Sequence, residues 1–168
     1  MRLFFILAVC GLVVGLFTSA AFAVTQSVTA NIAFDTALTL TKNADINFGR
    51  VKAATADTYT INTAGTVTAA GSGQYLGGTT AAGNITIAGS TTQTINVSVG
   101  NYTANGGVTP QSATCAYNGG GAAACSLTGV AAPGAGKTLL LGVQAVVDGS
   151  QAAGTTAAPT FDVTVVYN

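Results

Sequence analysis

The sequence lacks the side chains on which most enzyme chemistry depends. Among its 168 residues there is no histidine, no tryptophan and no glutamate, and only 6% of the residues are charged. Without histidine, the commonest general base and metal ligand is missing. A formal net charge of zero, with only five Lys and Arg residues, argues against binding to a phosphate backbone. We therefore expect no enzyme, no bound cofactor or metal, and no nucleic-acid partner.

The first 23 residues have the pattern of an export signal. Arg2 provides a positive charge, residues 3–17 are almost wholly apolar, and Ala21-Phe22-Ala23 fits the small-x-small rule for signal peptidase. A retained membrane anchor is the less favoured interpretation, because the apolar run is short for a span of about 20 residues. We expect cleavage after Ala23, no membrane insertion afterwards, and a mature chain exported to the periplasm and then to the cell surface or an extracellular fibre.

Two cysteines, Cys115 and Cys125, remain after this cleavage. Their even number and the export signal favour a disulfide formed in an oxidising compartment. Asn and Gly residues between them predict a turn, so the bond is expected to close a hairpin. A closed loop of about 11 residues stabilises the fold by roughly 2.8 kcal/mol in the chain-entropy model. A metal or redox pair is the alternative, but CxxC spacing and histidine are both absent.

Apolar and polar residues alternate in short runs along the chain, and no segment shows sustained helical periodicity. The longest alternation covers residues 24–41, and the cleanest covers the last eight residues. Asn- and Gly-containing turns at residues 105–107, 118–119 and 148–149 separate such runs. Many short strands at this spacing predict an all-β sandwich or barrel. Besides the first alternation, strands are expected at residues 45–51, 57–62, 65–68, 84–88, 92–99, 112–116, 126–130, 137–147 and 160–167.

Four motifs together resemble those of a known group of proteins. They are Asp45-Ile46-Asn47-Phe48-Gly49-Arg50-Val51, Leu139-Leu140-Leu141-Gly142-Val143, Gln151-Ala152-Ala153-Gly154, and the C-terminal stretch from Phe161 to Asn168. They lie at both ends of the mature domain. The group is a bacterial secreted domain family of unassigned function, akin to the spore coat protein U domain and to the major pilins of archaic chaperone–usher pili.

The resemblance implies an immunoglobulin-like β-sandwich that lacks one strand. In such pilins a periplasmic chaperone first fills the gap, and the N-terminal extension of the next subunit then replaces it at an outer-membrane usher. Together with the export signal, this gives a chain with a signal peptide (1–23), a candidate donor strand (24–35) and a sandwich domain (36–168). It assigns the contact with the chaperone to the C-terminal strand, through Phe161, Val163, Val165 and Tyr167.

The residues themselves offer a plausible donor strand directly after the cleavage site. Burial of two Val, one Ile and one Phe there contributes roughly 6–12 kcal/mol before ordering costs. The alternative is an ordinary first strand that folds back into its own domain. The apolar residues of the donor strand are Val24, Val28, Ala30, Ile32 and Phe34.

Two functions follow as hypotheses. The first is a structural, pilin-like subunit of a bacterial surface fibre, which polymerises with other copies of itself by donor-strand exchange and acts in adhesion or biofilm formation. The second is a self-contained secreted binding module for surface polysaccharide. This module would use exposed tyrosines as a sugar-stacking surface, and the candidates are Tyr59, Tyr75, Tyr102 and Tyr117.

Overall fold

The computed structural model describes residues 23–168 and divides them into two units. Apart from Ala23, the predicted export signal lies outside the described residues. Residues 23–33 belong to no helix or strand. Phe34–Asn168 forms the second unit, which contains every strand of the described chain.

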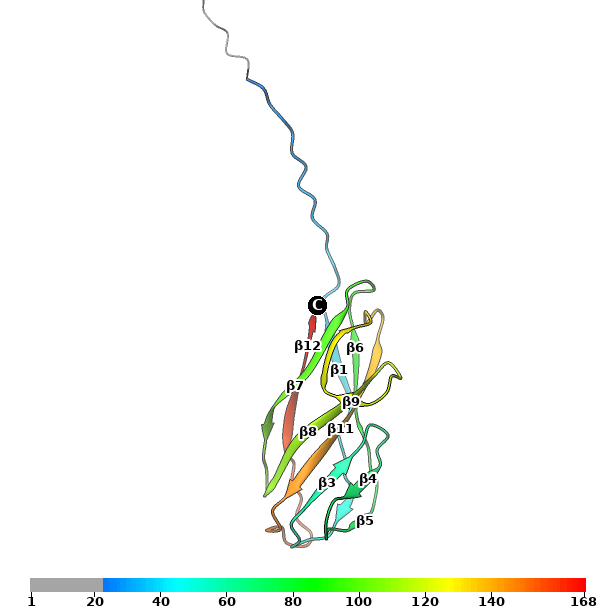
Figure 1. Cartoon of the computed structure of the whole chain (residues 1–168), viewed down its shortest axis with the longest axis vertical. Coiled ribbons are helices and arrows are strands. Elements are labelled where there is room, and N and C mark those ends of the chain that lie inside the picture. Colours follow the sequence, from blue (N-terminus) through cyan, green and yellow to red (C-terminus); the bar gives the residue numbers. More distant parts are fainter. Residues whose placement is uncertain (1–22) are drawn as a thin grey trace, which may run out of the picture. The chain divides into compact units, whose positions relative to one another are not determined.

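The second unit is built from twelve strands joined by antiparallel pairing alone (Figure 1). The prediction of an all-β sandwich is confirmed. The strands are β1 (Thr39–Ala44), β2 (Arg50–Val51), β3 (Asp57–Ile61), β4 (Val67–Ala69), β5 (Tyr75–Gly77), β6 (Gly83–Ala88), β7 (Ile95–Thr103), β8 (Val108–Tyr117), β9 (Ala123–Ala124), β10 (Ser126–Val130), β11 (Lys137–Val147) and β12 (Thr160–Tyr167).

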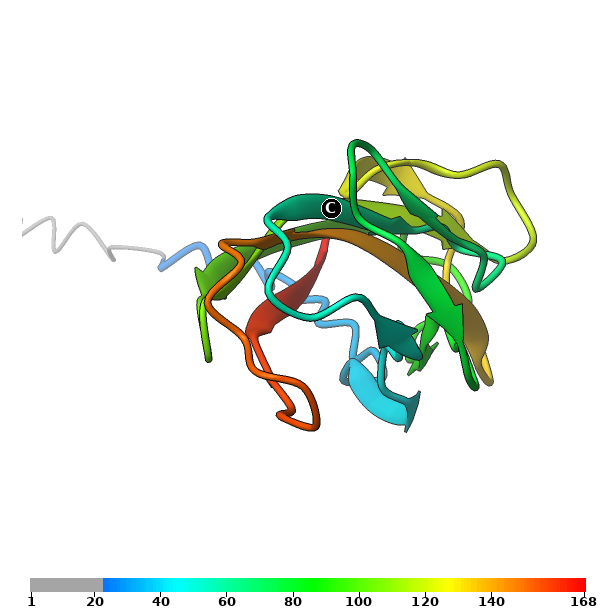
Figure 2. The same ribbon diagram turned by 90° about the horizontal axis from the view of Figure 1, so that it is seen from below.

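The larger of the two main sheets has seven strands and is organised around β11, the longest strand. On one side β11 pairs with β8 along nearly its whole length. On its other side β6 pairs with the first half of β11 and β3 with the second half, so these two strands lie end to end. β1 continues the sheet beyond β6, and β4 continues it beyond β3. Figure 2 shows this sheet as an arch, with β12 on its concave side.

The smaller main sheet, in the order β10-β7-β12, closes the sandwich. Its inward residues, such as Ile95 and Val97, pack with those of β11 in one core. Because side chains alternate along a strand, each strand supplies every second residue to this core. The fully inward positions of β11 are all buried, and they are Leu139, Leu141, Val143, Ala145 and Val147.

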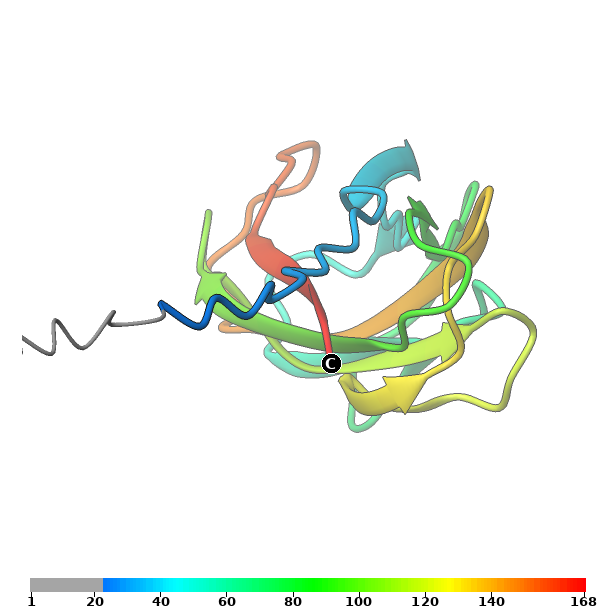
Figure 3. The same ribbon diagram turned by 90° about the horizontal axis from the view of Figure 1, so that it is seen from above.

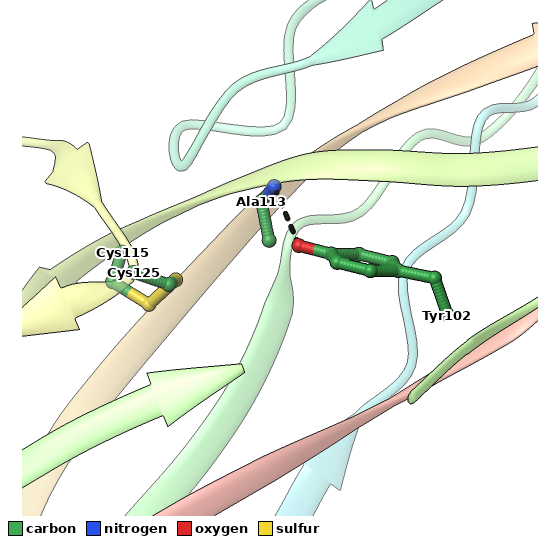
Figure 4. Close-up of a disulfide and its surroundings, with 4 residues drawn as sticks. All are labelled: Tyr102, Ala113, Cys115 and Cys125. Atoms are coloured by element: carbon green, nitrogen blue, oxygen red, sulfur yellow. Dashed lines mark hydrogen bonds between the residues drawn. A yellow bond between two sulfur atoms is a disulfide. The ribbon is translucent and has the colours of Figure 1, made fainter. Parts of the chain in front are cut away.

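The disulfide joins Cys115 and Cys125 where the chain crosses from one sheet to the other (Figure 4). Cys115 lies in β8, and β9 pairs back onto β8 in the large sheet. Cys125 directly follows β9, and the next strand, β10, pairs with β7 in the small sheet. Both cysteines are buried. The predicted disulfide and its hairpin are confirmed, and the bond also fixes the crossing point.

A β-bulge in β8 is closed by a tyrosine from the opposite sheet. Ser112 has a φ of 49°, and the register of β8 against β11 shifts beside it. The backbone N–H of Ala113 donates to the hydroxyl of Tyr102 in β7 at 3.0 Å (Figure 4). The Tyr102 ring also lies 5.6 Å from that of Phe161. Tyr102 is therefore a structural link between the two sheets.

The predicted strands differ from the observed ones mainly near the N-terminus. Regular pairing begins at Thr39, although the alternation begins at residue 24. The strand predicted at 45–51 is only β2, with an isolated bridge between Asn47 and Ala81, because a turn interrupts it. The sequence does not predict β5 and β9, since strands of three and two residues are too short to show an alternation.

We expect the double variant Cys115→Ala/Cys125→Ala to fold less stably than the wild type by about 3 kcal/mol, because the unfolded chain loses its closed loop. Denaturant unfolding of the oxidised wild type and of the variant measures this difference. Reducing the wild type should reproduce the loss, while the same reductant should leave the variant unchanged. A variant as stable as the oxidised protein would contradict the assignment of this role to the disulfide.

Candidate functional site

Two strands of the sandwich, β1 and β12, each end a sheet and have an unpaired edge. Within the described chain, β1 pairs with β6 alone and β12 pairs with β7 alone. Figures 2 and 3 show β12 on the concave side of the arched sheet, and β1 is an end strand of that sheet. The backbone N–H and C=O groups along each free edge have no partner strand, and such an edge is a template for pairing with a further strand.

The apolar side chains along these edges are only partly covered. The four inward residues of β12 are half-buried although they pack on the core. Leu40 of β1 is 41% exposed. By contrast, the inward residues of β11, the central strand of the large sheet, are buried. We call this set the open apolar edge: Leu38, Leu40, Ile46 and Ile85 on the β1 side, and Phe161, Val163, Val165 and Tyr167 on β12.

The predicted donor residues are exposed and lie outside every strand. Val24 is 93% exposed, Val28 89%, Ile32 76% and Phe34 88%, and Ala30 is exposed as well. No strand pairing is present in residues 23–38. We call residues 24–34 the N-terminal segment.

The penultimate residue, Tyr167, makes hydrogen bonds within its own domain. Its hydroxyl accepts the backbone N–H of Ser90 at 2.7 Å and donates to the backbone carbonyl of Thr36. The Ser90 hydroxyl in turn donates to the Asp35 carboxylate at 2.7 Å. The resemblance assigned Tyr167 to a chaperone contact, and the structure places its hydroxyl in a polar cluster beside the first residues of the domain. We call Asp35, Thr36, Ser90 and Tyr167 the Tyr167 cluster.

A glycine makes room for this cluster. A Cβ atom on Gly89 would overlap the Tyr167 hydroxyl and lie 3.1 Å from Leu38 Cδ2. The backbone of Gly89 and Ser90 is held from the other side by reciprocal hydrogen bonds with Gly134, each of 2.9 Å. Gly89 is therefore required by close packing, and no larger residue fits without displacing Tyr167.

The motif at residues 45–51 forms a tight turn. The side chain of Asn47 accepts the backbone N–H of Gly49 at 2.9 Å, and its backbone makes both hydrogen bonds of the bridge to Ala81. Gly49 has a φ of 68°, and a Cβ there would lie 2.8 Å from the carbonyl oxygen of Gly77. Ile46 and Phe48 point into the core on either side of Asn47. The motif thus has a structural role in shaping the β1 side of the domain.

The four tyrosines considered for sugar stacking do not form one exposed surface. Tyr59 and Tyr117 are buried, and burial raises the pKa of both phenols. The prediction of an exposed surface is wrong for these two. Tyr75 and Tyr102 are partly exposed, but their hydroxyls are used by the backbone of Gly78 and of Ala113.

One carboxylate, Asp148, organises the loop after β11. Hydrogen bonds from the side chain and backbone of Ser150 and from the side chain of Gln151 hold the pKa of Asp148 below its ordinary value of 3.8. Gln151 also donates to the backbone carbonyl of Gly106 at 2.9 Å, which ties this loop to the β7–β8 turn. These contacts are structural, and none of them builds a catalytic pair.

The described part of the chain offers no other chemical centre. Residues 23–168 contain no group of three or more side chains that could hold a metal ion. In the same range there is no helix long and apolar enough to cross a membrane. The open apolar edge and the N-terminal segment are therefore the features from which a function is argued.

The comparisons with known proteins give a family but no activity. The model of one protein family, described as a domain of unknown function (DUF4402), matches residues 38–167. The match begins at Leu38, just before β1, and runs to Tyr167, and so covers more than half of the chain. No curated protein and no solved structure matches the chain.

We expect Gly89→Ala to lower the free energy of unfolding by about 1–3 kcal/mol, because the new methyl group displaces the Tyr167 hydroxyl and leaves the buried Ser90 N–H unpaired. Thermal or denaturant unfolding measures the loss. Gly100→Ala is the matched control, since nothing lies within 4 Å of a Cβ at that position of β7. Equal stability of the two variants would contradict the packing described for Gly89.

We expect Asp148→Asn to weaken the acid sensitivity of the fold. The folded pKa of Asp148 lies below the unfolded one, so its carboxylate stabilises the fold above about pH 4, and this contribution disappears as the pH falls through the folded pKa. Melting temperatures measured between pH 7 and pH 2 test this. The wild type should lose more of its melting temperature across this interval than the variant, and parallel curves would refute the assignment.

Proposed function

We propose that this chain, which belongs to the DUF4402 family, is a pilin-like structural subunit of a bacterial surface fibre, with a role in adhesion or biofilm formation. In this proposal, the N-terminal segment of one copy adds a strand to the open apolar edge of the next copy. Export, a periplasmic chaperone and an outer-membrane usher complete the route by resemblance.

The observation that carries the proposal is a match between two uncovered apolar surfaces of one chain. The N-terminal segment exposes apolar side chains at every second position from Val28 to Phe34. β12 presents half-buried apolar side chains with the same spacing of two. At about 3.3 Å per residue, residues 24–34 extend to about 36 Å, which is more than the roughly 26 Å of an eight-residue strand such as β12.

Strand addition supplies its own driving force. The free edge of β12 gains a ladder of backbone hydrogen bonds, and the apolar side chains of both partners leave water. Two Val, one Ile and one Phe contribute roughly 6–12 kcal/mol of burial before ordering costs. Polymerisation by this route therefore needs no nucleotide or other cofactor.

The same edge explains why a chaperone belongs to the proposal. An unpaired strand with an uncovered apolar face aggregates with other copies. A subunit of this kind has to be covered between its export and its incorporation into a fibre. A periplasmic partner that lends a strand to β12 would provide that cover.

We expect the triple variant Val28→Ser/Ile32→Ser/Phe34→Ser to remain a folded domain and to lose polymerisation, because the donor strand no longer has an apolar face. The matched control replaces the intervening polar positions, as Thr25→Ser/Thr29→Ser/Asn31→Ser, and should polymerise like the wild type. Electron microscopy and size-exclusion chromatography of each protein, produced with its export machinery, measure assembly.

Two results would contradict the proposal. In the first, the triple variant assembles as well as the wild type. In the second, nuclear magnetic resonance of a stable wild-type monomer shows residues 24–34 paired with β1 or β12 of the same molecule. The latter outcome would favour the self-contained secreted module, in which the segment is an ordinary first strand.

A further inference from the structure

The Tyr167 cluster brings the end of one free edge strand to the point where the N-terminal segment joins the domain. Tyr167 is the last residue of β12, while Asp35 and Thr36 directly follow the segment. One hydroxyl group, Tyr167 Oη, bonds both to the Thr36 carbonyl and to the Ser90 N–H. The strand proposed to receive a neighbour's segment and the point from which this subunit's own segment leaves are thus joined by hydrogen bonds.

The cluster is built to be rigid. Ser90 is only 1% exposed, and its hydroxyl accepts the backbone N–H groups of Thr92 at 3.1 Å and Gln93 at 3.0 Å while it donates to Asp35. Asp35 also accepts the N–H of Thr36 at 2.7 Å. Because Ser90 is buried, a shift of the cluster would leave its N–H or hydroxyl unpaired, and this holds the exposed Asp35 in place.

The cluster holds a stretch of chain that has no strand partner and whose other contact with the core is Leu38. Pairing of β1 with β6 starts only at Thr39, so residues 34–38 have no strand partner. Without the cluster, the residues that precede Leu38 would form a loose linker between the domain and the segment. With it, Asp35 and Thr36 are held against the C-terminal end of β12.

We propose that Asp35, Ser90 and Tyr167 are positioning residues that fix the angle between successive subunits of the fibre. This inference rests on the proposed function. A neighbour's segment paired along β12 is linked through Tyr167 and Thr36 to the segment that this subunit donates onward. The orientation is then passed from subunit to subunit by hydrogen bonds, and the fibre is stiff.

The test is Tyr167→Phe, which keeps the ring in the open apolar edge and removes only the hydroxyl. Tyr75→Phe is the matched control, because it removes a hydroxyl that donates to the carbonyl of Gly78, away from the cluster. Asp35→Ala is a second variant, which breaks the bond to Ser90 at an exposed position. Two readouts are needed: backbone order at residues 35–38, and the bending of fibres.

Backbone order is measured by nuclear magnetic resonance and amide exchange in the monomer, which the Val28→Ser/Ile32→Ser/Phe34→Ser substitutions keep from polymerising. We expect Tyr167→Phe to speed exchange of the Ser90 amide at least about fivefold, as expected for the loss of one hydrogen bond. It should also lower the order of residues 35–38. Tyr75→Phe should change neither quantity.

Fibre bending is measured as persistence length in electron micrographs. We expect it to fall severalfold for Tyr167→Phe and for Asp35→Ala, and to stay unchanged for Tyr75→Phe. Ile61→Val is a second control, a destabilised core variant far from the cluster in sequence. It should also leave the persistence length unchanged, and this result would separate a positioning role from a general loss of stability.

The outcomes distinguish this inference from the proposed function. If the wild type forms no fibres, the proposed function fails and the inference fails with it. If the wild type forms fibres and those of Tyr167→Phe are equally stiff, or residues 35–38 keep their order in that variant, only the positioning role is overturned.

Discussion

The need to cover apolar side chains on an unpaired strand edge shapes this domain more than any other constraint. β12 is held on one side by β7, and its inward residues rest on a core to which β8 and β11 contribute the most residues. The other side of β12 and the edge of β1 have no partner strand in the described chain. The argument about function starts from the free edge of β12, because its half-buried apolar residues alternate with the same spacing as those of the N-terminal segment.

Much of the fold could be predicted from the sequence, because alternation is a local property. The boundaries of β10, β11 and β12 agree with the alternating runs, and the cysteine spacing predicted the hairpin. The Tyr167 cluster could not be predicted, since its bonds join residues 55, 77 and 131 positions apart. The sequence also did not show that Tyr59 and Tyr117 belong to the core. Which face of their strands points inward is decided by pairing with strands that are distant in the sequence.

The motif on which the resemblance rests describes architecture. Asn47 and Gly49 are needed to turn the chain beside Gly77, and Ile46 and Phe48 are needed to fill the core. None of these side chains is placed for chemistry on another molecule. Sharing this motif therefore means sharing a turn and the packing around it, which agrees with a family defined by a domain and not by an activity.

The place of the disulfide has a consequence for biogenesis. The two cysteines are only ten positions apart and close a loop at the passage between the two sheets. If the chain is exported as proposed, threading through a membrane from its amino end would deliver both thiols before β11 and β12 emerge. Oxidation could then form the bond while these two strands are still in transit, so the supply of oxidant at the exit site would govern the yield of correctly folded protein.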